Sequence, residues 1–119
     1  LDAIDTVSAK IALAAYADEH SIPLISSMGT GNKLHPELFR ISDLKDTSVC
    51  PLCRVMRKEL KTRGIQSLKV CWSPEKPLTP APAEEDTGSR RSTPGSISFV
   101  PPAAVLMIAG EIVRNICGL

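Results

Sequence analysis

The sequence predicts an α/β fold, and three observations indicate it. Helical patterns and short apolar runs follow one another in the order helix, strand, strand, helix, strand, loop, helix. The first six residues are typical of a buried strand that runs directly into a helix, with Asp5 or Thr6 as the N-cap. The first predicted helix is apolar on most sides, so we expect it to be largely buried in a larger sheet, with further strands before Leu1.

One helix and two strands are predicted in the first part of the chain. Residues 6–20 place apolar side chains at the 3.6-residue spacing of a helix and are rich in alanine. Residues 22–27 form a short apolar run typical of a buried strand, and residues 37–42 alternate in the manner of a second strand.

A glycine loop at residues 28–33 separates these two strands. Gly29 and Gly31 have two interpretations. They either allow a turn that needs positive φ, or they form a backbone cradle for an ion or a substrate.

The second predicted helix starts within residues 46–51 and runs to Arg63. Pro51 falls in its first turn and Gly64 lies just past its end, which are the positions that favour these two residues. The candidate N-cap is Ser48 or Thr47. The apolar positions at helical spacing predict a buried stripe of Leu52, Val55, Met56 and Leu60.

A third strand and a final helix are predicted in the remainder. Residues 67–72 alternate, which puts on one face Leu68, Val70 and Trp72. Residues 73–96 hold five of the ten prolines and many charged and small residues, so we expect a mobile loop there. Residues 103–117 form an apolar helix closed by Gly118, which either packs against the sheet or lies at a dimer interface.

Composition limits the class of protein. The net charge of +1 gives no global reason to expect nucleic acid or membrane as a partner. The aromatic content of 3% requires an aliphatic core. The longest apolar run, residues 97–109, is shorter than the ~20 residues of a membrane span, and no segment is typical of a signal peptide. We therefore expect a cytoplasmic protein, whose four cysteines are thiols or metal ligands rather than disulfides.

Cys50 and Cys53 form a CxxC motif at the start of the second predicted helix. A zinc site would need two further ligands, and the other candidates lie at unrelated spacings: Cys71, Cys117, His20 and His35. A redox pair is an alternative, because a helix N-terminus lowers the pKa of a thiol. Two buried structural cysteines are the third interpretation.

The same helix carries a basic face, made by Arg54, Arg57, Lys58, Lys61 and Arg63. Such a face is either a solvated surface or a contact for RNA phosphates. Arg90 and Arg91 in the predicted loop could also contact RNA. The sequence offers no aromatic platform for base stacking.

A run of motifs in order resembles one family; these motifs are residues 2–6, 23–33, 49–52, 54–60 and 95–104. Together they resemble the ThiF/MoeB/HesA adenylating enzymes and, more narrowly, the tRNA threonylcarbamoyladenosine dehydratases. The resemblance implies the C-terminal half of a Rossmann-like ThiF/MoeB-type adenylating domain. The N-terminal nucleotide-binding half of that domain is not in this sequence, which has no GxGxxG motif.

The resemblance also implies an activity. Such enzymes use ATP and magnesium to adenylate the threonylcarbamoyl carboxylate of tRNA, and the group then cyclises with loss of water. Asp5 aligns with the aspartate that the family places near the triphosphate and its magnesium, and Asp2 is the second expected cofactor-binding residue. The implied partners are tRNA, a second copy in a homodimer, and a sulfur-transfer protein. We expect the chain alone to be inactive.

Two other functions are compatible with the residues. One is ThiF/MoeB-type adenylation of the C-terminus of a sulfur-carrier protein, although such enzymes have a second CxxC that this chain lacks. The other is a noncatalytic module that binds RNA or protein. Residues 96–99 contain no cysteine, where some relatives carry a reactive one, so a persulfide or thioester step is not expected.

Overall fold

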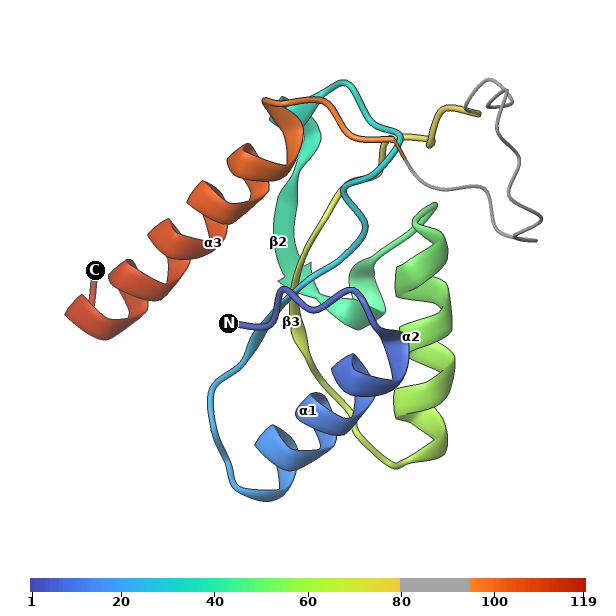
Figure 1. The fold of residues 1–119 in the computed structure, drawn as a ribbon. Helices are drawn as coiled ribbons and strands as arrows, with labels where there is room; N and C mark the ends of the chain where they lie inside the picture. The colour runs from blue at the N-terminus through green and yellow to red at the C-terminus, as the bar shows by residue number, and fades with distance from the viewer. Residues whose placement is uncertain (80–94) are drawn as a thin grey trace.

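The computed structural model describes residues 1–79 and 95–119 and shows a small sheet between helices (Figure 1). Most of the predicted loop at residues 73–96, with Arg90 and Arg91, lies outside the described residues. The elements, in chain order, are α1 (Val7–Glu19), β1 (Ile25–Ser27), η1 (Pro36–Leu38), β2 (Arg40–Asp43), η2 (Leu44–Asp46), α2 (Pro51–Thr62), β3 (Lys69–Trp72) and α3 (Val100–Cys117).

The sheet has three strands in the order β1-β3-β2. β1 pairs with β3 in parallel, and β2 pairs with β3 antiparallel. Asp2 extends the sheet beyond β1 by a parallel bridge to Ser26. Its N–H donates to Ile25 O at 2.9 Å, and Ser27 N–H donates to Asp2 O at 2.8 Å. The carboxyl ends of the first segment, β1 and β3 therefore meet at one edge of the sheet.

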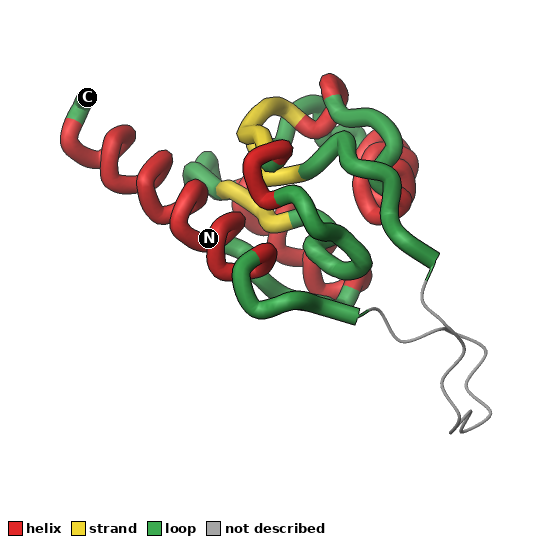
Figure 2. Tube along the Cα trace, turned by 90° about the horizontal axis from the view of Figure 1, so that it is seen from above, coloured by secondary structure: helices red, strands yellow, loops and turns green. Residues whose placement is uncertain are grey.

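Helices cover both faces of this sheet, as the views in Figures 1 and 2 show. α1 and α2 pack on the face that contains Leu68, Val70 and Trp72, as the alternation predicts. α3 packs on the opposite face, against Ile25 and Cys71. The result is a three-layer α/β/α arrangement with one aliphatic cluster on each side of the sheet.

The burial of α1 differs from the expectation. The helix begins and ends within one residue of the predicted bounds, and Thr6 occupies the N-cap position. Only one face is buried, however, made by Lys10, Ile11, Ala14 and Ala17. The expectation of burial on most sides is wrong for the described residues, because α1 packs against α2 and the sheet edge on one side only.

The second predicted strand begins too early. Pro36–Leu38 form a short 3₁₀ helix, and β2 starts at Arg40. Pro36 has a fixed φ and no N–H for a ladder hydrogen bond, so it favours the start of a helical turn over a strand.

The start of α2 also differs from the prediction. Its N-cap position is occupied by Cys50, not by Ser48 or Thr47. Thr47 instead donates its hydroxyl to Leu44 O at 2.7 Å and closes the turn after η2. The buried stripe consists of Cys53, Met56 and Leu60, which share one face at helical spacing; the prediction that Val55 belongs to it is wrong, since Val55 is 44% exposed.

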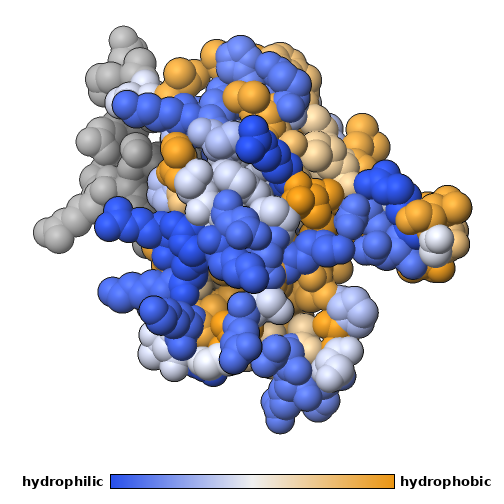
Figure 3. All heavy atoms as spheres, turned by 180° about the vertical axis from the view of Figure 1, so that it is seen from behind, coloured by the Kyte–Doolittle hydropathy of each residue, from blue (hydrophilic) through white to orange (hydrophobic). Residues whose placement is uncertain are grey.

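α3 begins three residues earlier than predicted and ends at Cys117 as predicted; Gly118 follows it with a φ of 70°, the left-handed conformation that closes helices. Val100, Ala104 and Ile108 anchor it on the sheet. Most of its other apolar side chains are exposed, and they form part of the orange surface seen from behind in Figure 3. By length and composition alone this helix could cross a membrane, but its anchored face belongs to the core of the fold.

Candidate functional site

A hollow of about 680 Å³ opens at the edge where the first segment and β1 end. In open α/β sheets, ligands bind in crevices outside the carboxyl ends of parallel strands. The hollow is lined by the loop before α1, the glycine loop after β1 and the start of α3. The lining residues used below are Asp5, Lys10, Ser27, Gly29 and Gly31.

A buried charge network underlies this hollow. Lys10 Nζ lies 3.2 Å from Asp2 Oδ2 and donates to Ser27 O at 2.7 Å; Ser26 Oγ donates to Asp2 Oδ2 at 2.6 Å. Lys10 is 2% exposed and Asp2 1%. A charge at such depth is tolerated when it is paired and hydrogen-bonded, as both of these are.

The network also fixes the chain that leads to α1. The second carboxylate oxygen of Asp2, Oδ1, accepts a hydrogen bond from Ile4 N at 2.9 Å. Both oxygens of Asp2 are therefore engaged within the protein. The direct contact of Asp2 with a cofactor stays a prediction. In the structure, the hydrogen bonds of Asp2 position the loop that carries Asp5.

Asp5 is exposed and lines the hollow one residue before the N-cap of α1. Within residues 1–79 and 95–119, its carboxylate makes no hydrogen bond or ion pair. An exposed carboxylate beside a sheet edge can take up a hard cation such as magnesium, which prefers oxygen ligands. The predicted role of Asp5 in binding the nucleotide and its magnesium stays a prediction.

The glycine loop does not adopt the predicted positive φ at a glycine. That conformation falls on Asn32, with φ of 57°. Asn is one of the few non-glycine residues that tolerate it. Asn32 Oδ1 accepts a hydrogen bond from Gly95 N at 2.9 Å and so joins this loop to the segment before α3. Lys33 is buried and donates to Gly29 O at 2.9 Å, which closes the loop on itself.

Two lysines of this region, Lys10 and Lys33, were not among the predicted site residues. A signal for Lys10 exists in the sequence: it stands four and seven residues before Ala14 and Ala17, on the buried face of α1. A lysine at such a position is expected to have a buried acidic partner. Lys33 has no comparable signal, because the loop that buries it has no periodicity.

Cys50 and Cys53 lie beneath the glycine loop and are almost fully buried. The Cys53 thiol, the N–H groups of Cys53 and Gly29 and the charge of Lys33 hold the pKa of Cys50 near 5, although burial opposes this. The contact with Cys50, together with burial, raises the pKa of Cys53. Among the described residues no group of three metal-ligating side chains occurs, so the two cysteines have no third zinc ligand there.

The predicted basic face is on the outer side of α2. Arg54, Lys58 and Lys61 are exposed. Arg63 pairs with Glu59 at 3.2 Å. Arg57 is half-buried and donates to the carbonyl and the hydroxyl of Thr47. The cations therefore lie along one helix rather than around the first hollow.

The characterised proteins that the chain resembles in sequence are tRNA threonylcarbamoyladenosine dehydratases. No family model matches the chain. It is 34% identical over 125 residues to the tRNA threonylcarbamoyladenosine dehydratase of Bacillus subtilis, covering 98% of this chain and 49% of that protein. It is 42% identical over 92 residues to tRNA threonylcarbamoyladenosine dehydratase 2 of Saccharomyces cerevisiae, covering 71% of this chain and 21% of that protein.

Solved structures that resemble this fold belong to the same class of protein. The protein described as TcdA (CsdL) superposes with a TM-score of 0.69 at 26% identity, over 93% of this chain and 50% of that one. The Escherichia coli dehydratase in complex with ATP superposes with a TM-score of 0.65 at 25% identity, over 95% of this chain and 49% of that one. The chain thus spans about half the length of the first of these relatives and of both solved structures.

Proposed function

We propose that this chain, a homologue of the tRNA threonylcarbamoyladenosine dehydratases over about half of their length, supplies part of the active site of such an ATP-dependent enzyme. The observation that carries the proposal is the exposed carboxylate of Asp5 at the rim of a hollow at the sheet edge. Similarity over 98% of this chain to a dehydratase supplies the reaction class.

The chemistry begins from a poor electrophile, the carboxylate of the threonylcarbamoyl group. ATP would adenylate this carboxylate with release of pyrophosphate, so that AMP becomes a good leaving group on the carbonyl carbon and departs when the ring closes. An internal nitrogen, held beside the activated carbon, then closes the ring, because an intramolecular attack has a high effective molarity. Loss of one water is the net change in the nucleoside.

The residues of this chain fit part of that task. The Asp5 carboxylate offers oxygen ligands for the magnesium that accompanies ATP. It stands just before the N-terminus of α1, where the helix dipole favours anionic phosphate groups. Asp2 and Lys10 act indirectly, since their buried pair fixes the backbone of residues 3–5.

Binding of tRNA is assigned to the outer side of α2. Its exposed cations, Arg54, Lys58 and Lys61, can neutralise phosphates, which provides the salt-dependent part of RNA affinity.

The experiment that tests the function is nucleoside mass spectrometry. tRNA carrying threonylcarbamoyladenosine is incubated with magnesium-ATP and the full-length protein, with an active dehydratase as the positive control. The expected result is an ATP-dependent loss of one water from the modified nucleoside. No loss, with the control active, overturns the proposal and favours carrier-protein adenylation or a noncatalytic module.

A further inference from the structure

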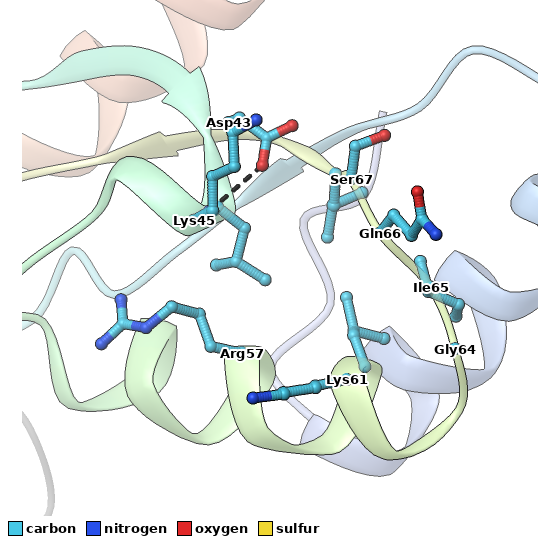
Figure 4. A pocket seen from close by; sticks show the side chains of 11 residues that line it. Asp43, Lys45, Arg57, Lys61, Gly64, Ile65, Gln66 and Ser67 are labelled. Carbon is cyan, nitrogen blue, oxygen red and sulfur yellow. Dashed lines mark hydrogen bonds between the residues drawn. The ribbon is translucent and has the colours of Figure 1, made fainter.

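A second hollow, of about 470 Å³, lies at the opposite edge of the sheet from Asp5 (Figure 4). Three segments surround it: the C-terminal half of α2, the turn that follows β2, and the residues that lead into β3. Because it lies away from the carboxyl ends of the parallel strands, it is suited to docking rather than to chemistry.

Local backbone geometry creates the hollow. α2 ends at Thr62, and Gly64 adopts a φ of 73°, which turns the chain away from the helix axis. Residues 65–67 then run back to the sheet and leave a space beside the helix. Its floor consists of buried leucines that belong to the core: Leu44, Leu60 and Leu68.

The rim of the hollow is cationic. Lys45, Arg57 and Lys61 line it, and Asp43 is the one acidic lining residue. In Figure 4 Arg57 and Lys61 extend from α2, while Asp43 and Lys45 stand across from them. Asp43 Oδ1 accepts a hydrogen bond from Lys45 N at 3.1 Å.

The two lysine ammonium groups are available for a ligand. Within residues 1–79 and 95–119, neither Lys45 Nζ nor Lys61 Nζ makes a hydrogen bond or an ion pair. Arg57 is held by its contacts with Thr47, so its guanidinium has a fixed place at the rim. The occupant should therefore combine an apolar, flat body with at least one negative charge.

We propose that this hollow binds one unpaired nucleotide of the tRNA substrate, with the base over the leucine floor and its phosphate between Lys45 and Lys61. The choice of RNA as the occupant rests on the proposed function. RNA-binding proteins recognise sequence mainly through unpaired bases, which stack on aromatic side chains or on arginine planes; in this hollow Arg57 is the lining residue with such a plane. The volume falls within the range of about 300–1,000 Å³ of small-molecule sites.

Polar groups at the rim fit the edge of a base. Gln66 has an amide that both donates and accepts, and Ser67 has a hydroxyl. Farther along α2, Arg54 and Lys58 lie outside the hollow, where they can contact flanking phosphates. An acidic peptide would satisfy the cations but would leave the apolar floor uncovered.

The first test compares two exposed lysines. Lys61→Gln and Lys76→Gln each remove one exposed positive charge, but only Lys61 lines the hollow, and Lys76 lies outside the basic face of α2. Affinity for tRNA is measured by fluorescence anisotropy with the full-length protein. Lys61→Gln should weaken binding about tenfold and Lys76→Gln about twofold or less, since only the first loses a contact with the docked nucleotide.

The second test fills the hollow without changing charge. Ser67→Trp places a large side chain at the rim, and Thr62→Trp is the control on α2 outside the hollow. Ser67→Trp should weaken tRNA binding about tenfold and lower the salt slope, because the displaced nucleotide also loses its phosphate contact with Lys45 and Lys61. Thermal melting verifies that both variants are folded.

The outcomes separate this inference from the proposed function. If wild-type protein binds tRNA, and each variant behaves like its control, the hollow is not the nucleotide site although the dehydratase proposal stands. Displacement of tRNA by a polyglutamate peptide but not by a single-stranded RNA oligonucleotide also overturns the inference. If wild-type protein binds no tRNA, the inference and the proposed function both fail.

Discussion

The ammonium group of Lys10 lies 3.2 Å from the carboxylate of Asp2, and the two side chains are 2% and 1% exposed. This pair joins α1 to the first segment of the sheet. Ser26, in the neighbouring strand, donates to the same carboxylate oxygen at 2.6 Å. Three segments of the chain are thus held together at the edge of the sheet where the first hollow opens.

The pair makes a prediction about stability. Lys10→Met leaves the Asp2 carboxylate buried without its cation, which should lower the free energy of unfolding by about 3–5 kcal/mol. Urea denaturation of the full-length protein measures this change. Lys58→Met, at an exposed position of α2, is the control and should change the free energy by about 0.5 kcal/mol or less.

A double variant shows whether the loss of stability in Lys10→Met comes from the broken pair with Asp2. In Lys10→Met with Asp2→Asn, no unpaired charge is left, so the loss should be smaller than the sum of the two single losses by at least about 1 kcal/mol. Strictly additive losses would mean that the two groups are not coupled.

Asp5 should be essential for turnover but not for folding. Asp5→Ala removes the exposed carboxylate at the rim of the first hollow. Because this carboxylate has no partner among the described residues, the melting temperature should be nearly unchanged, while ATP-dependent loss of water falls at least about 100-fold. The matched control is Asp46→Ala, an exposed aspartate in η2. Near-normal turnover by Asp5→Ala would remove Asp5 from the mechanism.

The sequence predicted elements whose signals are local. The alternation of Leu68, Val70 and Trp72 identified both the strand and its buried face, because a strand has a period of two residues. Pro51 and Gly64 bracketed α2 because each residue suits one helix end for a backbone reason. The N-cap at Thr6, one of the two candidates, likewise followed from the local change from strand to helix.

The sequence did not predict features that depend on contacts between residues far apart in the chain. Lys10 finds Asp2 eight residues away and Ser26 sixteen residues away, and only the folded sheet brings the three together. The burial of Lys33 and the hollow beside α2 likewise arise from loops without a periodic pattern. The shift of the α2 N-cap to Cys50 has a local cause instead, since Thr47 is taken up by the turn with Leu44 before the helix.

The thiol pair predicts a pH dependence. The pKa of Cys50 is about 5 in the folded protein, below that of a free thiol, so unfolding takes up a proton between these values. Relative to Cys50→Ser, the wild-type protein should therefore gain stability as the pH rises from about 5 to about 9. Above that range the gain should reverse, because the pKa of Cys53 is raised in the folded protein.

Unfolding free energies of both proteins across this pH range, under reducing conditions, provide the measurement. Cys117→Ser is the control, since that cysteine is exposed at the end of α3. A wild-type minus Cys50→Ser difference that is flat from pH 5.5 to 8.5 would contradict a thiolate at Cys50.

The exposed side of α3 predicts a homodimer. Leu106, Val113 and Ile116 are 73%, 56% and 79% exposed, and their spacing puts them on one side of the helix, away from the anchor residues Val100 and Ile108. An apolar stripe of this kind on a folded domain usually marks an interface. Leu106→Glu together with Val113→Glu should convert a dimer to a monomer in sedimentation velocity. Asn115→Glu adds a carboxylate elsewhere on the same helix and should leave the dimer intact; a monomeric wild-type protein would refute the assignment.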